Sequence, residues 1–218
     1  MVLKLYGLAC AVGGTGVVAM VLVEKQVPFE LVPVDLANRE HKAPEYLEKH
    51  PFGQVPLIDD GGFILYETRA ICRYIAEKYA DQGTPLIPTE FKAKALFEQA
   101  ASIEYSNFNP YAFAIYFEGL SKPRRGLQKD QAAFDKAVSD LSAKLDAYEV
   151  ILGKQKYMAG DELTLADLAH LAFRGLLEPA GCDLMTTKGP NIARWWKDIT
   201  SRPSLVNLQK DGIRSTAP

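Results

Sequence analysis

The segment His50–Arg73, HPFGQVPLIDDGGFILYETRAICR, decides how the rest of the chain is interpreted. Its apolar runs and the Asp-Asp-Gly-Gly turn at 59–62 predict a loop followed by a β-hairpin, with strands at 57–58 and 63–65. A helix is expected to open at Glu67, directly after the second strand. Because loop, hairpin and helix start follow without a break, the segment forms a compact arrangement for holding an extended peptide.

Positions on both sides of the hairpin suit a peptide with charged ends. Val55 precedes Pro56, so its backbone favours the extended region, and X-Pro bonds are the ones in which the cis form is readily accessible. An extended residue before a turn can pair its N–H and C=O with another extended peptide. Glu67 and Thr68 stand at a helix start, whose free N–H groups suit a carboxylate. Taken singly, Gln-Val-Pro also fits an ordinary turn and Glu-Thr an ordinary helix cap.

The two motifs together resemble a known family. PFGQVP at 51–56, followed by ETRAI at 67–71, is similar to the glutathione-binding half of cytosolic glutathione transferases. The preceding Glu40-His41-Lys42 resembles the phi class of that family, which is known from plants and fungi. The resemblance covers essentially the whole chain. It implies an α/β thioredoxin-like N-terminal domain and an all-α C-terminal domain.

The residue pattern by itself predicts two domains. Residues 1–80 are expected to follow the order β-α-β-α-β-β-α of a thioredoxin-like domain, opening with a parallel βαβ unit. Residues 81–90, with two prolines and a glycine, are expected to be a linker. An all-helical domain is then expected at 91–218. Helices are expected at 92–105, 110–120, 129–152, 168–177 and 192–199, and a loose tail is expected at 210–218.

Composition excludes several classes of protein. The formal net charge of −2 over 218 residues gives no electrostatic basis for binding nucleic acid or an anionic membrane. Three widely spaced cysteines, Cys10, Cys72 and Cys182, argue against a disulfide framework or a zinc site and suit a reducing compartment. We see no signal peptide and no stretch long and apolar enough to span a membrane. A cytoplasmic protein without a metal, membrane or nucleic-acid partner is expected.

Glutathione, as the expected co-substrate, has an ammonium, two carboxylates and a thiol to be recognised. The resemblance implies that Glu67 pairs with the ammonium, while Thr68 and the amides of its helix start hold the γ-glutamyl carboxylate. Gln54 is implied as a further contact to the γ-glutamyl part. These partners are the ones that the charges require, a carboxylate for the ammonium and N–H donors for the carboxylate.

The remaining contacts implied by the resemblance lie in the loop. Val55-Pro56 would pair its backbone with the cysteinyl unit, and His41 and Lys42 would hold the glycyl carboxylate. A histidine and a lysine in a polar loop are by themselves also typical of an ordinary surface. His50 and His170 have no partner that indicates metal or triad chemistry, so the sequence assigns neither to the site.

The chemistry of the thiol is the point at which the chain departs from its class. Phi enzymes place a serine at the start of the first helix, and the matching position here is Ala11. Possible substitutes are the hydroxyl of Thr15, the thiol of Cys10, the helix-start amides or a water. A helix N-terminus favours an anion by roughly 0.3 to 1 kcal/mol, so amides alone would lower a thiol pKa by about one unit at most. Cys10 itself is expected to be a small buried apolar residue, and Gly13 rules out a Cys-x-x-Cys pair.

The electrophile and the assembly are less clearly encoded. The family builds an apolar electrophile pocket from residues matching Leu8, Val12, Phe113, Tyr116 and Phe117, although aromatics at helical spacing are equally typical of a core. A homodimer is also implied by the resemblance. In that dimer Phe52 would contact the second copy, with packing inside its own loop as the alternative.

Together these observations predict a glutathione transferase that conjugates glutathione to hydrophobic electrophiles, with low activity if the missing hydroxyl is limiting. Peroxide reduction by glutathione is a plausible side activity. Two other functions stay open at this point. One is a non-catalytic, ligandin-type carrier of glutathione and hydrophobic ligands, and the other is a thiol reductase dependent on Cys10.

Overall fold

The computed structural model describes residues 2–217, and contacts between Cα atoms divide the chain into two compact units. The first comprises Met1–Pro85 and Arg202–Pro218, and the second comprises Leu86–Ser201. The first change of unit falls inside the linker expected at 81–90. The end of the chain differs from the expectation, because it packs with the thioredoxin-like unit and not with the helical one.

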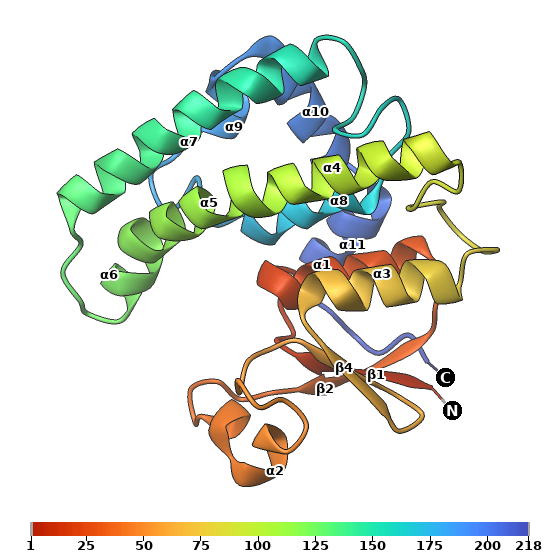
Figure 1. Ribbon diagram of the computed structural model, residues 1–218. Helices are drawn as coiled ribbons and strands as arrows, with labels where there is room; N and C mark the ends of the chain where they lie inside the picture. The colour runs from red at the N-terminus through yellow and green to blue at the C-terminus, as the bar shows by residue number, and fades with distance from the viewer. Residues whose placement is uncertain (1, 218) are drawn as a thin grey trace. The chain divides into compact units, whose positions relative to one another are not determined.

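A four-stranded sheet forms the centre of the first unit (Figure 1). The strands are β1 (Leu3–Gly7), β2 (Phe29–Pro33), β3 (Leu57–Asp60) and β4 (Phe63–Tyr66), in the order β2-β1-β3-β4. β1 and β2 are parallel, as a βαβ crossover requires, whereas β3 pairs antiparallel with both β1 and β4. The β-α-β-α-β-β-α order predicted for a thioredoxin-like domain is confirmed.

Helices complete this unit. α1 (Gly13–Glu24) packs against α3 (Thr68–Lys78) and α11 (Pro203–Asp211), while the short η1 (Glu40–Lys42) and α2 (Pro44–Leu47) belong to the loop before β3. The middle of α1 is buried all round, which explains why its sequence is apolar on every face. The sheet and these helices therefore fix the two helix N-termini on which the candidate site depends.

The end of the chain is a fixed part of this unit, so the loose tail expected from residue 210 is wrong. Thr216 donates its backbone N–H to the carbonyl of Phe29 at 2.8 Å and accepts from the N–H of Phe29 through Oγ1 at 3.1 Å. Ser215 Oγ accepts from the N–H of Leu31 at 2.9 Å. The tail thus covers the outer edge of β2, whose backbone groups would otherwise be unpaired.

The second unit is all-helical, as predicted. Its elements are α4 (Phe91–Asn107), α5 (Asn109–Tyr116), η2 (Phe117–Ser121), α6 (Lys122–Arg124), α7 (Gln131–Leu152), α8 (Leu165–Ala169), η3 (His170–Phe173), α9 (Leu184–Thr187) and α10 (Pro190–Thr200). The helix expected at 168–177 is placed too late, since helical structure starts at Leu165 and stops at Phe173. It stops there because Arg174 is extended, at ψ 130°, and Gly175 has a φ of 76°.

A buried carboxylate organises the core of the second unit. Asp167 accepts hydrogen bonds from the indole N–H of Trp195 at 3.0 Å and from the backbone N–H of Met158 at 2.9 Å. It also accepts from the N–H of Thr164 at 2.9 Å, which completes the expected capping box at the start of α8. Burial raises the pKa of Asp167, and these bonds oppose that shift. Thr164 and Asp167 therefore stabilise the fold of the helical unit.

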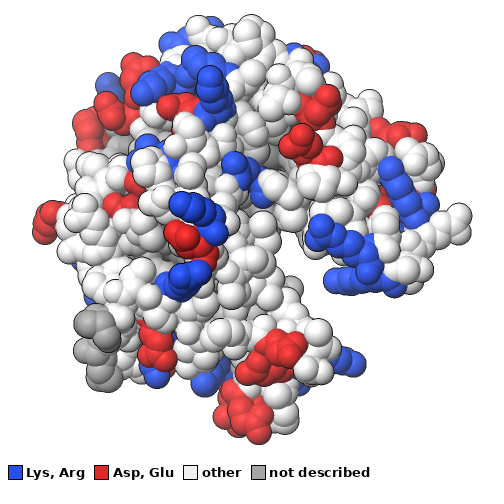
Figure 2. All heavy atoms as spheres, turned by 180° about the vertical axis from the view of Figure 1, so that it is seen from behind, with Lys and Arg blue, Asp and Glu red and all other residues white. Residues whose placement is uncertain are grey.

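Charged side chains of both signs are interspersed over the face shown in Figure 2. The described atoms of that face show no broad basic field of the kind that binds nucleic acid. None of the helices in residues 2–217 combines the length and the hydropathy that crossing a membrane requires.

Candidate active site

The amino ends of α1 and α3 meet the loop before β3 at Gly14. A Cβ built on Gly14 would overlap the hydroxyl of Thr68 and lie 2.9 Å from Cδ of Pro56. Only glycine leaves room for this approach, so three segments that are distant in sequence lie side by side. The peptide bond between Val55 and Pro56 is cis. The structure thus brings the two helix starts together with the Val55-Pro56 segment that the sequence singled out.

The amino end of α1 is an open anion site in its geometry. Its N-cap residue Val12 is extended, and among the described residues no side chain caps this end and no acidic side chain lies in the first turn. The first N–H groups of a helix have no partner within the helix and carry the positive end of its dipole. Ala11 is only 8% exposed and packs on the helix, since a Cβ on Gly16 would lie 2.6 Å from its carbonyl carbon.

Thr15 does not face a ligand. Its side chain is 2% exposed and lies against Gly7, where an added Cβ would overlap the hydroxyl. The hydroxyl accepts a long hydrogen bond, 3.4 Å, from the N–H of Leu8. Thr15 therefore supports the turn between β1 and α1, and this placement does not favour the expectation that its hydroxyl activates a thiol.

Cys10 is exposed, so the expectation of a small buried residue is wrong. Its thiol is free, and its carbonyl accepts a 2.9 Å hydrogen bond from the N–H of Val12. The tight turn at Ala11 turns the side chain outward. Cys72 and Cys182, by contrast, are buried, and burial raises the pKa of both thiols.

Glu67 has a strained backbone at the start of α3. It is the N-cap residue, with φ 74° and ψ 111°, and its side chain is exposed. Non-glycine residues rarely adopt a positive φ, and such a conformation costs about 1 to 3 kcal/mol. Thr68 follows as the first helical residue and contacts Gly14. A carboxylate and a helix start are thus held together at the edge of the candidate site.

Hydrogen bonds hold the loop that contains η1 and the residues before β3. Lys42 donates from Nζ to the carbonyl of Phe52 at 2.9 Å, and the hydroxyl of Tyr46 donates to the carbonyl of Gln54 at 2.7 Å. Gly53 has a φ of 56° and lies against the carbonyl of His41. The predicted loop contacts His41, Lys42 and Gln54 therefore share one rigid frame.

His41 carries an unpaired ring nitrogen. Its Nδ1 is buried and has no hydrogen-bond partner within residues 2–217. Desolvation, and then the charges of Lys42 and Arg39, lower the pKa of His41, so the ring favours its neutral form. A bound carboxylate would reverse this preference, because an opposite charge stabilises the protonated ring.

His50, which the sequence did not assign to the site, lies at the centre of an aromatic group. Its ring is 2% exposed and stacks on Tyr66 with centroids 4.4 Å apart and on Tyr46 at 6.4 Å, and the edge of Phe52 lies 6.2 Å away. Burial lowers the pKa of His50, and the charge of Glu67 opposes this. The position of His50 directly before the loop motif was the one available signal.

The C-terminal segment also reaches this region. The N–H of Ile213 donates to the carbonyl of Ala9 at 2.8 Å, and the side chain of Ile213 is buried. Gly212 has a φ of 72°, and an added Cβ would lie 3.2 Å from the same carbonyl. The loop that leads into α1 is therefore held from the far end of the chain.

The residues expected to form an electrophile pocket lie in both units. Leu8 and Val12 of the first unit are partly exposed. In the second unit Phe113 is 53% exposed, and its ring lies 6.1 Å from the rings of both Tyr116 and Phe117. The aromatic residues are thus a partly exposed cluster and not a closed core. In the part of the chain that the structure describes, no group of three or more His, Cys, Asp or Glu is placed to hold a metal.

Comparison with known families identifies the fold. The model of the glutathione S-transferase N-terminal domain matches residues 1–77, and that of the C-terminal domain matches residues 105–203. The chain belongs to the glutathione S-transferase family. The transferase is 42% identical over 209 residues to glutathione S-transferase hmp2 of Hypomyces subiculosus, covering 94% of this chain and 97% of the relative. It is 39% identical to glutathione S-transferase F9 of Arabidopsis thaliana, with 94% of each chain covered.

Solved structures agree with this assignment. Glutathione transferase F7 from Populus trichocarpa matches the transferase with a TM-score of 0.91 and 40% identity, over 96% of this chain and 98% of the other. Glutathione S-transferase I from maize, solved with an atrazine glutathione conjugate, matches with a TM-score of 0.85 and 33% identity, over 97% and 99% of the two chains. The expected resemblance to the phi class is confirmed by these plant relatives.

Proposed function

We propose that this glutathione transferase conjugates glutathione to hydrophobic electrophiles without a side-chain hydroxyl at its thiol. The observation that carries the proposal is the buried methyl group of Ala11 beside the uncapped amino end of α1. The N–H groups of that end would stabilise the thiolate, which is the nucleophile. The sulfur attacks the electrophilic carbon, a carbon–sulfur bond forms, the leaving group departs with its electron pair, and the thiol proton passes to solvent.

We assign the groups of glutathione to partners in the first unit. Glu67 would bind the ammonium, and Thr68 with the amides of α3 the γ-glutamyl carboxylate, because both lie at one helix start that contacts Gly14. Val55, directly before the cis bond to Pro56, would pair its backbone with the cysteinyl unit. This places the thiol toward α1, since Pro56 and α1 are in contact at Gly14.

The loop supplies the remaining glutathione partners. His41 and Lys42 would hold the glycyl carboxylate, and the unpaired Nδ1 of His41 supports this assignment. Gln54 would contact the γ-glutamyl part, with its backbone fixed by Tyr46. Charge-assisted hydrogen bonds of this kind are stronger than neutral ones.

For the electrophile we propose apolar surface in each unit, taken separately: Leu8 and Val12 in the first, and the aromatic cluster of Phe113, Tyr116 and Phe117 in the second. The maize relative solved with an atrazine glutathione conjugate supports a hydrophobic electrophile. Peroxides are a second substrate class that a glutathione thiolate could attack. A cytoplasmic location stays a prediction.

We further propose that the transferase is a homodimer. Phe52 is 64% exposed although it is a large apolar residue, and it adjoins the aromatic group around His50. Exposed apolar side chains of this size mark contact sites when they belong to a larger patch. Sedimentation of wild type and Phe52→Ser tests this: a dimer that dissociates on substitution is expected, and a monomeric wild type would contradict it.

The exposed thiol of Cys10 favours one alternative, a thiol reductase. Initial rates of conjugation with 1-chloro-2,4-dinitrobenzene and of disulfide reduction, measured for wild type and Cys10→Ser, separate the two. We expect conjugation to survive the substitution nearly unchanged. If the protein only reduces disulfides and Cys10→Ser abolishes that activity, the reductase replaces our proposal. Binding of glutathione without either reaction would indicate a carrier.

A further inference from the structure

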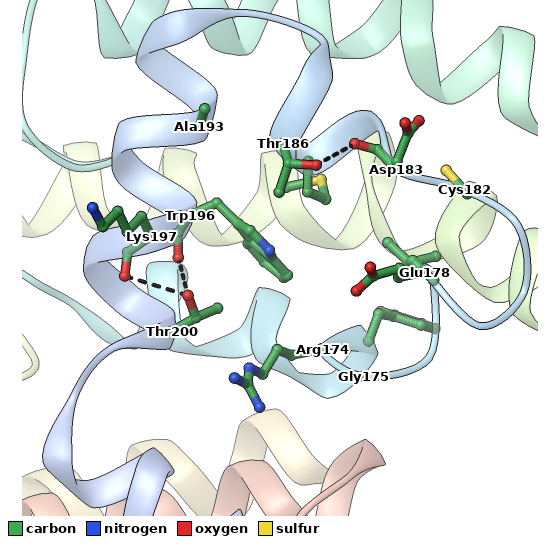
Figure 3. Close-up of a pocket in the computed structure, with 13 residues that line it drawn as sticks. Arg174, Gly175, Glu178, Cys182, Asp183, Thr186, Ala193, Trp196, Lys197 and Thr200 are labelled. Carbon is green, nitrogen blue, oxygen red and sulfur yellow. Dashed lines mark hydrogen bonds between the residues drawn. The ribbon is translucent and has the colours of Figure 1, made fainter.

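The helical unit contains a cavity of about 580 Å³, and its lining residues are not part of the proposed glutathione site. It is lined by 13 residues between positions 173 and 200, and none of them is among the residues assigned to glutathione or to the electrophile (Figure 3). Small-molecule sites usually have volumes of 300 to 1,000 Å³, and they combine apolar walls with a few polar groups. The cavity has the size of a ligand site.

An aromatic face and a carboxylate meet across this cavity. Figure 3 shows the indole of Trp196, on α10, and the carboxylate of Glu178 reaching into the space from opposite sides. Within the described residues neither the indole N–H of Trp196 nor the carboxylate of Glu178 makes a hydrogen bond or an ion pair. Apolar side chains such as Leu177 and Met185 complete the wall.

The other polar groups of the lining are turned away or already occupied. In Figure 3 the side chains of Lys197 and Asp183 point out of the cavity, and the guanidinium of Arg174 lies at its edge, directed away from Glu178. The hydroxyl of Thr200 donates to the carbonyl of Trp196 at 2.6 Å, and that of Thr186 donates to the carbonyl of Asp183 at 2.9 Å. The carboxylate of Glu178, an exposed residue, therefore supplies a negative charge at the open side of the cavity, opposite an indole.

We propose that this cavity is a second small-molecule site, which binds a planar aromatic cation with its ring against Trp196 and its charge toward Glu178. Tryptophan is the aromatic side chain that attracts cations most strongly through its face, and the effect increases when the ion is desolvated. A flat ligand also matches the apolar wall better than an inorganic cation would.

Titration of the full-length protein with thioflavin T, a planar cationic dye, tests the proposal. Saturable binding is expected, and saturating S-hexylglutathione should leave it unchanged because that compound occupies the other site. Glu178→Gln keeps the shape of the side chain but removes its charge, and it should weaken the dye about tenfold; Trp196→Tyr should weaken it less, since a smaller ring face remains. Glu162→Gln, an exposed carboxylate of the same unit outside the lining, is the matched control and should have no effect.

The anionic dye 8-anilinonaphthalene-1-sulfonate completes the test. Its binding to the cavity should be weaker than that of thioflavin T and should improve in Glu178→Gln. The proposal is overturned if thioflavin T does not bind saturably, if S-hexylglutathione displaces it, or if Glu178→Gln binds it as tightly as wild type. Equal weakening by Glu162→Gln would also overturn it, since the effect would then come from surface charge in general.

Discussion

The backbone N–H of Ile213 donates to the carbonyl of Ala9 at 2.8 Å, which ties the last segment of the chain to the loop that leads into α1. Ile213 is buried, and Gly212 beside it adopts a positive φ where the backbones approach. The loop carries Ala11, beside which we propose that the thiol of glutathione binds. The C-terminal segment is therefore expected to affect catalysis as well as stability.

Ile213→Pro removes this donor, because proline has no N–H. We expect kcat for conjugation to fall several-fold with a smaller change in KM for glutathione, since the binding loop before β3 is untouched. Ile213→Val keeps the N–H and loses one methylene, so it should cost about 1 kcal/mol of stability and little activity. Equal kcat values for Ile213→Pro and Ile213→Val would show that the bond does not position the loop.

Arg202 and Ser204, at the start of the C-terminal segment, bind Glu24, and this contact should make the stability of the fold depend on pH. Burial disfavours the charge of Glu24, but hydrogen bonds from Arg202, Ser204 and Thr84 outweigh it and hold the pKa of Glu24 below its ordinary value. A carboxyl group whose pKa is lowered by folding contributes stability above the unfolded pKa, about 4.3, and loses it as the pH falls through the folded value.

Glu24→Gln should therefore cost about 2 kcal/mol at pH 7, in the range of hydrogen bonds to charged groups. Urea unfolding from pH 7 to pH 3 measures the effect. The difference between wild type and variant should shrink only below about pH 4.3. A difference that is constant across this range would mean that the charge of Glu24 is not what binds Arg202.

Glu67 offers a test in which affinity and stability move in opposite directions. Glu67→Gly relieves the positive φ but removes the carboxylate, so the free energy of unfolding should stay equal or rise while glutathione affinity falls about tenfold or more. Gln26 has a similar φ of 54° and lies at the end of α1, away from the site. Gln26→Gly is the matched control, with unchanged affinity in calorimetric titration. Unaltered affinity in Glu67→Gly would remove Glu67 from the site.

Ala11→Ser introduces a hydroxyl at the position where the sequence resemblance leads us to expect one. A hydrogen bond to a charged group contributes about 1.5 to 3 kcal/mol, so conjugation should become about tenfold faster. Ala9→Ser makes the same change two residues earlier, at an exposed position, and should leave the rate unchanged. If Ala11→Ser gives no gain, another group already stabilises the thiolate as well as a serine would.

Local chemistry explains which parts of the fold were predictable. The hairpin and α3 follow from turn residues and from the apolar periodicity of 57–71, which act over a few residues. α11 and the ordered tail were missed because they depend on contacts far apart in sequence: Arg202 binds Glu24, 178 residues away, and Thr216 binds Phe29. No local pattern encodes such a contact. The helix expected at 168–177 failed at Arg174, where the apolar pattern continues although the backbone becomes extended.

In the candidate site, too, the features that follow from local sequence were predictable, and those that depend on tertiary contacts were not. The residues that we propose for glutathione binding follow from a motif, and the structure brings the helix starts of Gly14 and Thr68 together. The environment of Thr15 and Cys10 could not be read from the sequence. The direction of the Thr15 hydroxyl depends on how closely Gly7 approaches it, and the exposure of the Cys10 thiol depends on the turn at Ala11.

We have proposed that the amides at the amino end of α1 activate the thiol of glutathione beside Ala11. Titration of the protein–glutathione complex across pH, followed by the ultraviolet absorbance of the thiolate, measures this directly. We predict that bound glutathione ionises about one pKa unit below the free thiol, since the amides of a helix start supply about 1 kcal/mol. Glutathione that binds but ionises at the pKa of the free thiol would contradict the account and leave the protein a carrier.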